Sequence, residues 1–346
     1  MTALQGSLAL AIALLVPAAA VAASVPARAP GGERFYEDKS INLIVGYAPA
    51  GAPDVYGRLV ARHLGRHLRG NPRIVVRNMP GAGSLLAANH IFNAAPKDGT
   101  VLGLLAPTIP LEEILGSEAG RYKASGFHWI GRLATNSNIT FIVNTSRVKT
   151  IADAFDQVAI LGATGRSSTN AIYPIVLNNV LGTKFEMVMG YGGSAEVMLA
   201  MERGEVEGHS ATYDGLMTQH GDWIRTGKVN IVVQYLLKRH RELPDVPTAR
   251  ELARNPEQEE ILTVISTASE IGKFILTTPG VPAQRVAALR DAFDTMVKDP
   301  AFLAEAAKLR IELDPLTGEE LQRLVEDVQS LPADMVEKVK AIYPLN

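Results

Sequence analysis

The strongest constraint on the fold is an alternation of two kinds of segment that begins near residue 41. Short runs of β-branched and other apolar residues, typical of buried strands, alternate with longer runs whose apolar residues recur at helical spacing. Strands are predicted at residues 41–48, 73–78, 100–106, 139–145, 158–164, 185–191 and 229–236. Helices are predicted at residues 55–68, 84–95, 169–182 and 195–205, and most of the tail from residue 282 is predicted to be helical. This alternation is typical of an α/β fold.

Composition excludes several function classes. The chain has 346 residues and 47% hydrophobic content, enough for two ordinary hydrophobic cores. Its formal net charge of -2 provides no global field for nucleic acid, so we expect no nucleic-acid partner. It has no cysteine, which excludes disulfides and thiolate metal sites. No histidine pair fits H-E-x-x-H and no glycine-rich segment completes a nucleotide fingerprint, so we expect neither a metal nor a cofactor.

The N-terminus has the features of a secretory signal peptide. Residues 7–23 are apolar, are interrupted by Pro17 and contain Ala20-Val21-Ala22, which fits the A-x-A cleavage pattern. We expect residues 1–22 to be removed on secretion and residues 23–34 to form a linker. The alternative is a membrane anchor, although the run is short for a spanning helix.

Ligands of parallel α/β sheets bind at the carboxyl ends of the strands, so the loops there are candidate sites. In the first such loop, residues 48–54, Pro53 suits the first helical position and Ala52 is the expected cap. Alanine has no side-chain acceptor, so the first-turn amides are expected to be free for a carboxylate. The alternative is an ordinary turn whose amides face water. Asp54 and Arg58 are spaced for an ion pair on the helix.

Two further loops carry polar groups at the same edge. Residues 162–169 combine two glycines, Arg166 and four hydroxyl side chains. These hydroxyls either cap the next helix or donate to a carboxylate beside the guanidinium, and the sequence leaves both open. Residues 190–194 place Tyr191 and Ser194 between a strand and a helix.

A serine hydrolase is the alternative from a different class. The segment Gly208-His209-Ser210-Ala211-Thr212 resembles the G-x-S-x-G nucleophile elbow, but its last position is not glycine. Its neighbours also lack the expected strand-to-helix context. We therefore expect no enzymatic activity, with a periplasmic hydrolase of small esters as the competing hypothesis.

Several motifs, in order, resemble a known family. They are residues 41–58, 78–83, 96–100, 162–169, 191–194, 204–207, 243–251 and 279–283. Together they resemble the receptors of tripartite tricarboxylate transporters, the Bug-type extracytoplasmic solute receptors. The likeness covers nearly the whole chain after the predicted signal peptide.

The resemblance implies an α/β fold of the type II periplasmic binding protein class, a Venus flytrap. Each of its two lobes is a mixed β-sheet flanked by helices. By analogy, lobe one is residues 35–138 plus 237–346 and lobe two is residues 139–236. The implied function is capture of a small organic carboxylate between the lobes and its delivery to a membrane permease. The implied location is the periplasm and the implied state is a monomer.

The resemblance and the loops together give the expected ligand-binding residues. They are Tyr47, Pro49, Ala50, Gly51, Ala52, Asp54, Thr108, Thr164, Gly165, Arg166, Ser167, Ser168, Tyr191, Gly192 and Asp214. The first loop of this chain is bulkier and drier than the family pattern, because it contains Ala50, Ala52 and Pro53, and Arg166 is an unusual choice. We therefore expect a mono- or dicarboxylate with an apolar or aromatic body.

Overall fold

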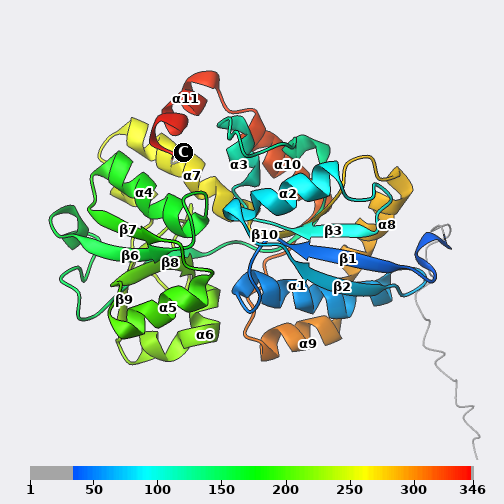
Figure 1. The fold of residues 1–346 in the computed structure, drawn as a ribbon, viewed down its shortest axis with the longest axis horizontal. Helices are drawn as coiled ribbons and strands as arrows, with labels where there is room; N and C mark the ends of the chain where they lie inside the picture. Colours follow the sequence, from blue (N-terminus) through cyan, green and yellow to red (C-terminus); the bar gives the residue numbers. More distant parts are fainter. Residues whose placement is uncertain (1–33, 344–346) are drawn as a thin grey trace, which may run out of the picture. The chain divides into compact units, whose positions relative to one another are not determined.

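Two mixed β-sheets, each flanked by helices, organise the chain (Figure 1). The computed structural model describes residues 34–343, which all belong to one compact unit, Glu33–Asn346. The predicted signal peptide, residues 1–22, and the predicted linker up to residue 33 lie outside the described residues. The predicted fold class, α/β with two mixed sheets flanked by helices, is confirmed. Across residues 34–343, no helix is both long enough and apolar enough to cross a membrane.

Sheet A has the strand order β11-β4-β10-β3-β1-β2. Its strands are β1 (Ser40–Val45), β2 (Arg73–Asn78), β3 (Val101–Leu104), β4 (His128–Ala134), β10 (Lys273–Thr277) and β11 (Leu316–Thr317). Strand β1 pairs in parallel with β2 and β3, whereas β10 runs antiparallel to β3 and β4. Leu43 and Val45 on one face of β1 and Ile44 on the other are all buried, as expected for a strand inside a sheet with helices on both faces.

The helices around sheet A come from both ends of the chain. They are α1 (Ala52–His63), α2 (Leu85–Asn93), α3 (Ile109–Ile114), α8 (Ala283–Met296), α9 (Pro300–Lys308) and α10 (Gly318–Gln329). In Figure 1, α2 and α10 lie on one side of the sheet, and α1 and α9 lie on the other. Trp129 of β4 packs against Phe274 of β10 with ring centroids 4.7 Å apart, inside the core on the α2 side.

Sheet B has the strand order β7-β6-β8-β5-β9. Its strands are β5 (Asn138–Val143), β6 (Ala159–Ala163), β7 (Phe185–Met189), β8 (Gly208–Thr212) and β9 (Val229–Gln234). Strand β6 pairs in parallel with β7 and β8, and β5 runs antiparallel to β8 and β9. The surrounding helices are α4 (Thr169–Leu181), α5 (Ser194–Arg203), α6 (Tyr213–Arg225), α7 (Pro256–Ile271) and α11 (Ala333–Ile342).

Three chain segments meet where the two sheets join. The Asn136 amide, between β4 and β5, donates to the Ser269 carbonyl of α7 at 2.8 Å. The Tyr235 amide, just after β9, donates to the Asn138 carbonyl at 2.8 Å, and Ser269 Oγ donates to the Tyr235 carbonyl at 2.7 Å. These hydrogen bonds, two between backbone groups and one from a side-chain hydroxyl, therefore hold the crossovers in register and fix the ends of the two sheets against each other.

Helices from the C-terminal third also pack on sheet B. Ile265 of α7 and Val339 of α11 are buried in one hydrophobic cluster with Leu161 of β6 and Leu177 of α4. The lobe boundaries derived from the resemblance, 35–138 plus 237–346 and 139–236, stay a prediction. The cluster shows that the apolar core beside sheet B draws on residues beyond 236.

Candidate functional site

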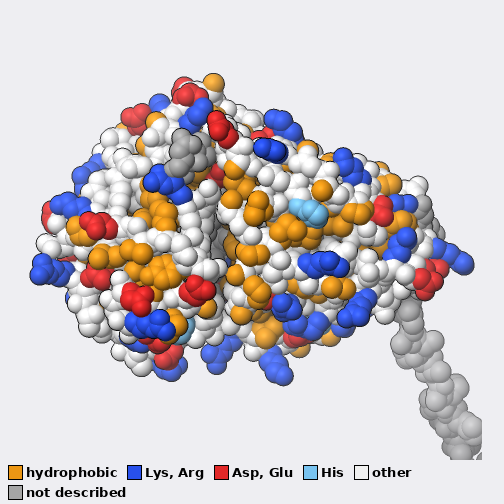
Figure 2. All heavy atoms as spheres, in the orientation of Figure 1, with side chains coloured by type: hydrophobic (Ala, Val, Ile, Leu, Met, Phe, Trp, Pro, Cys, Tyr) orange, Lys and Arg blue, Asp and Glu red, His pale blue; other side chains and the backbone are white. Residues whose placement is uncertain are grey.

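A cleft of about 480 Å³ opens between the ends of sheets A and B. Figure 2 shows it as a groove that runs down the middle of this face. Its walls are the loops after β1, β2, β6 and β7, the β8–α6 junction and the β4–β5 crossover. The lining consists of residues 46–49, 51–53, 80–84, 106, 136, 138, 164–170, 191–195, 198, 210–212, 215 and 219. Carboxyl ends of parallel strands from both sheets therefore meet at one cavity, as α/β ligand sites require.

Most of the predicted ligand-binding residues lie in this lining. They are Tyr47, Pro49, Gly51, Ala52, Thr164, Gly165, Arg166, Ser167, Ser168, Tyr191 and Gly192. Four others lie outside it, namely Ala50, Asp54, Thr108 and Asp214. The contacts or burial of these four residues are described below. That the lining residues bind a ligand stays a prediction.

The loop after β1 ends in an uncapped helix. Helix α1 begins at Ala52, its N-cap is Gly51 and no side chain of the described part of the chain caps it. The expected cap, Ala52, is therefore wrong by one residue, because Pro53 takes the second helical position rather than the first. The first-turn amides nevertheless lack a side-chain cap, as expected, because glycine, like alanine, has no side-chain acceptor.

Asp54 stabilises this loop instead of facing the cleft. Its Oδ2 accepts from the Ala50 amide at 2.9 Å and from Arg58 Nε at 2.8 Å, and its Oδ1 accepts from Asn78 Nδ2 at 2.8 Å. Burial raises the pKa of Asp54, but the bonds from Arg58, Ala50 and Asn78 outweigh burial and lower it overall. The carboxylate thus holds Ala50 in its left-handed conformation, φ 66°.

Arg166 is the charged group of the cleft. Among the described residues that form the lining, it is the only one with a charged side chain. It is exposed and makes no hydrogen bond or ion pair with another described residue. A guanidinium left without a protein partner at a cavity is available for an anion.

Ser168, in the same loop as Arg166, forms hydrogen bonds within the loop itself. Ser168 Oγ bonds within the loop to the Gly165 carbonyl and to Asn170 Oδ1, and Asn170 Oδ1 also accepts from the Thr164 amide at 3.2 Å. Ser168 is the N-cap of α4 by position but makes no cap bond to an amide. Sequence reasoning missed Asn170, although an asparagine in a first helical turn is a common loop anchor.

The loop after β7 also ends in a helix without a side-chain cap. Helix α5 has Gly193 as its N-cap, and the Gly192 amide donates to Glu196 Oε2 at 2.7 Å. Gly192 therefore lines the cleft, but its amide already donates to Glu196. Tyr191 and Ser194 complete this wall.

The junction of β8 with α6 was missed by the sequence analysis. Residues Gly208–Thr212 form a strand and Tyr213–Arg225 a helix, so the expected absence of a strand-to-helix context is wrong. Thr212 caps α6 by accepting from the Gly215 amide at 3.3 Å. The Thr-x-x-Gly spacing with Asp214 in the first turn is a helix-start signal that could have revealed this junction.

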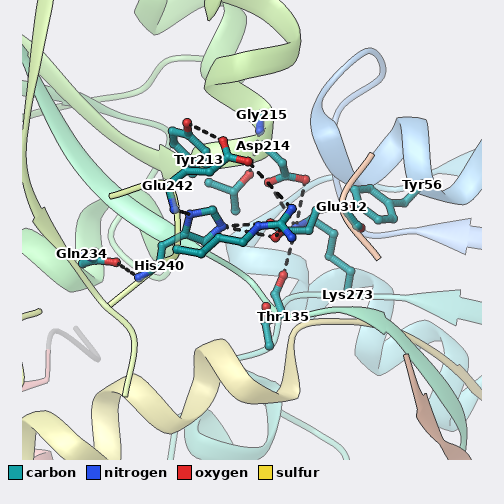
Figure 3. Close-up of polar contacts among 12 residues, drawn as sticks. Tyr56, Thr135, Tyr213, Asp214, Gly215, Gln234, His240, Glu242, Lys273 and Glu312 are labelled. Carbon is teal, nitrogen blue, oxygen red and sulfur yellow. Dashed lines mark hydrogen bonds and ion pairs between the residues drawn. The ribbon is translucent and has the colours of Figure 1, made fainter. Parts of the chain in front are cut away.

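Asp214 belongs to an ion pair beneath the cleft (Figure 3). Its Oδ2 lies 3.2 Å from Lys273 Nζ, and both side chains are buried. Lys273 Nζ also lies 3.4 Å from the Thr135 carbonyl and 4.8 Å from the centroid of the Tyr56 ring. Burial raises the pKa of Asp214, but Lys273 and the surrounding hydrogen bonds lower it overall, so the carboxylate stays ionised and paired.

Thr108 is at the start of α3 and is almost fully buried. It lies outside the lining, which Ala106 reaches from the same segment between β3 and α3.

The floor of the cleft is a network of hydroxyl and amide groups. Ser210 and Asn138 line the cleft. Thr140 Oγ1 lies 2.5 Å from Ser210 Oγ and 2.7 Å from the Tyr235 hydroxyl, and Asn138 Nδ2 donates to the Tyr173 hydroxyl at 3.3 Å. Burial raises the pKa of Tyr235 well above its usual value, so the phenol stays neutral. The described hydroxyl and amide groups of the floor can therefore donate and accept hydrogen bonds with a ligand, and none of these groups is charged.

Comparison with known proteins agrees with this architecture. A UPF0065 protein in the gbd 5′ region of Cupriavidus necator is 25% identical over 327 residues, covering 92% of this chain and 90% of that protein. An R. palustris protein solved with adipate has a TM-score of 0.69 at 20% identity and covers 88% of this chain and 98% of its own. MatC from Rhodopseudomonas palustris with bound malate has a TM-score of 0.67 at 20% identity, covering 86% and 99%. These two structures share the fold with this chain.

The family assignment comes from the sequence. Residues 57–342 match the family described as tripartite tricarboxylate transporter family receptor. Because this match covers most of the chain, the protein belongs to the receptor family of the tripartite tricarboxylate transporters.

Proposed function

We propose that the protein is an extracytoplasmic receptor that captures a small organic carboxylate in the cleft between sheets A and B. It then delivers this ligand to a membrane permease of the tripartite tricarboxylate transporter type. Membership of the receptor family supports the transport role. Adipate and malate, the ligands in the two R. palustris structures, are both dicarboxylates and support the ligand class.

One observation carries the proposal. Three helices, α1, α4 and α5, direct N-termini without side-chain caps at a single cavity, and their N-cap residues Gly51, Ser168 and Gly193 all line it. Helix N-termini carry partial positive charge and free amides, which favour an anion. Arg166 adds the one full positive charge that the described residues contribute to the lining. A carboxylate matches this arrangement because its two oxygens accept several hydrogen bonds at once.

The remaining lining favours an organic body on the ligand. Pro49, Pro53, Met198 and Ala211 give the cleft apolar wall, and Tyr191 adds an aromatic ring. We therefore propose a mono- or dicarboxylate with an apolar or aromatic body. A highly charged tricarboxylate would leave charges facing these walls without partners.

The alternative of an ester hydrolase has less support. Ser210 lines the cleft, but its hydroxyl bonds to Thr140 Oγ1, and within residues 34–343 it has no hydrogen bond to a histidine. A nucleophilic serine requires an adjacent base. We propose that the protein binds its ligand without turnover.

The predicted signal peptide and the family together support a periplasmic location. We propose that the mature receptor acts there as a monomer.

Thermal unfolding with a panel of carboxylates tests the proposal. The panel contains C3 to C10 mono-, di- and tricarboxylates, each with its neutral amide as a control. A ligand at a hundredfold excess over Kd adds about 2.7 kcal/mol to the free energy of unfolding, so at least one acid raises Tm while its amide does not. Incubation with the methyl esters of the same acids, followed by analysis for free acid, tests for ester hydrolysis. No shift with any acid contradicts the receptor function.

A further inference from the structure

Ser194, in the cleft wall at the start of α5, is hydrogen-bonded to a buried histidine. His209 Nε2 lies 3.0 Å from Ser194 Oγ, and His209 Nδ1 lies 2.8 Å from the Gly162 carbonyl oxygen. His209 is fully buried in β8, and Phe141 packs edge-on against its ring. Ser194 itself is half-buried and belongs to the cleft lining.

The partner at Nδ1 fixes the tautomer of His209. A carbonyl oxygen only accepts hydrogen bonds, so Nδ1 carries the proton. Burial lowers the pKa of His209 to about 4, so the imidazole is neutral near pH 7. A neutral imidazole has one N–H, which leaves Nε2 as a bare acceptor.

This tautomer in turn fixes the hydroxyl of Ser194. A serine hydroxyl has one proton and two lone pairs, and the proton is needed by the bare Nε2. Toward the cleft, Ser194 Oγ therefore presents lone pairs only. Ser167, in the loop after the neighbouring strand β6, has no such histidine among the described residues, and its hydroxyl is free to rotate and donate.

We propose that Ser194 is a specificity-determining residue that accepts a hydrogen bond from the ligand. This inference rests on the proposed function and narrows its ligand class. The ligand carries a carboxylate for Arg166 and the helix N-termini, and in addition a hydroxyl or N–H group that donates to Ser194. A second carboxylate at this position would place lone pairs against lone pairs and is disfavoured.

His209 acts through Ser194 and is a positioning residue. It does not reach the cleft lining, and its role is to hold the direction of one hydroxyl. Removing the Nε2 acceptor frees the proton of Ser194, which is then able to donate to a ligand acceptor. Loss of His209 should therefore change which ligands bind, beyond any loss of stability.

The test uses matched acids that differ in one donor. The pairs are lactate with propionate, malate with succinate and 3-hydroxybutyrate with butyrate, and the O-methyl ether of each hydroxy acid keeps the oxygen but lacks the donor. Calorimetric titration of the mature protein gives Kd for each acid and each ether. We expect at least one hydroxy acid to bind about tenfold more tightly than both its deoxy and its O-methyl partner.

Two variants separate positioning from folding. Ser194→Ala removes the acceptor, so the tenfold preference should fall to about one. His209→Asn retains an amide near the position of Nδ1 but has no group at Nε2, so the preference should fall and the O-methyl ether should bind more tightly than in the wild type. If His209→Asn does not fold, Ser194→Ala alone decides.

The outcomes distinguish the two proposals. Equal affinity of the hydroxy, deoxy and O-methyl acids for the wild type overturns the acceptor role and leaves the receptor function intact. A preference that survives in Ser194→Ala also overturns it. If no acid of the three series or of the wider carboxylate panel binds, both proposals fail.

Discussion

Lys273 Nζ lies 3.2 Å from Asp214 Oδ2, and this buried ion pair joins β10 of sheet A to the first turn of α6 beside sheet B (Figure 3). Lys273 also contacts the Thr135 carbonyl in the β4–β5 crossover. Asp214 is next to the α6 N-terminus whose residues Thr212 and Gly215 line the cleft. The pair therefore fixes one wall of the cleft to the opposite sheet without touching the cavity.

Removing only one charge of this pair should lower the free energy of unfolding. Asp214→Asn leaves the Lys273 ammonium buried without a counter-charge, and we expect it to lower the free energy of unfolding by about 3 to 5 kcal/mol. Glu202→Gln is the matched control, because Glu202 lies at the same 3.2 Å from Lys228 but both side chains are exposed. Its expected cost is below about 1 kcal/mol. Urea denaturation measures both, and equal costs would show that burial adds nothing to the Asp214–Lys273 pair.

Glu112 of α3 should give the protein a distinct pH dependence of stability. Burial raises the pKa of Glu112 from its ordinary 4.5 to about 7, although the Tyr343 hydroxyl donates to its Oε1 at 3.0 Å. Between these two pH values the folded chain binds more protons at this site than the unfolded chain. Stability from this group is therefore complete below about pH 4.5 and falls as the pH rises to about 7, by up to about 3 kcal/mol.

Glu112→Gln removes this titration and keeps an acceptor for Tyr343. We expect the variant to gain stability relative to the wild type as the pH rises from 4.5 to 7, measured by denaturation at each pH. The control is Glu118→Gln, because Glu118 lies shortly after α3 and is exposed. Its difference in stability from the wild type should not change with pH. A flat difference for Glu112→Gln would mean that Glu112 is ionised in the folded state at the lower pH.

The sequence was sufficient to predict the loops after β1, β6 and β7. In each, glycine, proline or hydroxyl residues separate an apolar strand from a helical run, and residues such as Gly51, Ser168 and Tyr191 then follow from position alone. The α/β class followed from the same alternation, whereas the two mixed sheets followed from the resemblance to the receptor family. These features depend on local sequence, which is why they could be predicted.

The features that the sequence did not place correctly depend on partners distant in the chain. Asp214 was expected in the cleft, but Lys273 of β10 holds it beneath the floor. Asp54 was expected there too, but Asn78 of β2 holds it against its own loop. Strand β8 was missed because Gly208–Thr212 is polar and lacks the β-branched apolar run that marks the predicted strands. His209 is buried there only because Gly162 and Ser194 satisfy its ring nitrogens.

Gly83 should be required for the two walls of the cleft to meet. Its φ is +60°, and a Cβ built on it would lie 2.0 Å from the Ser167 carbonyl oxygen of the opposite wall. Backbone atoms cannot rotate away as a side chain does, so Gly83→Ala forces the two loops apart. We expect ligand affinity to fall at least about tenfold, since the lining groups no longer converge on the ligand. Small-angle scattering with ligand should show a larger radius of gyration than the wild type.

A second glycine separates closure from backbone strain. Gly204 has a similar φ of +74°, and a Cβ there would meet nothing within 4 Å. Gly83→Ala and Gly204→Ala should each lose about 1 kcal/mol or more of stability from the left-handed conformation. Only Gly83→Ala should change affinity. If both variants bind as the wild type does, the contact between Gly83 and Ser167 has no part in binding.

The most direct measurement is calorimetric titration of the best acid from the carboxylate panel into the wild type, Arg166→Gln and Arg147→Gln. Arg147 is an exposed arginine outside the cleft lining and serves as the control. We predict saturable binding to the wild type, an unchanged Kd for Arg147→Gln and a Kd about thirtyfold higher for Arg166→Gln, which corresponds to about 2 kcal/mol for a lost charge-assisted hydrogen bond. An acid that binds Arg166→Gln as tightly as the wild type would contradict the assignment of this cleft as the carboxylate site.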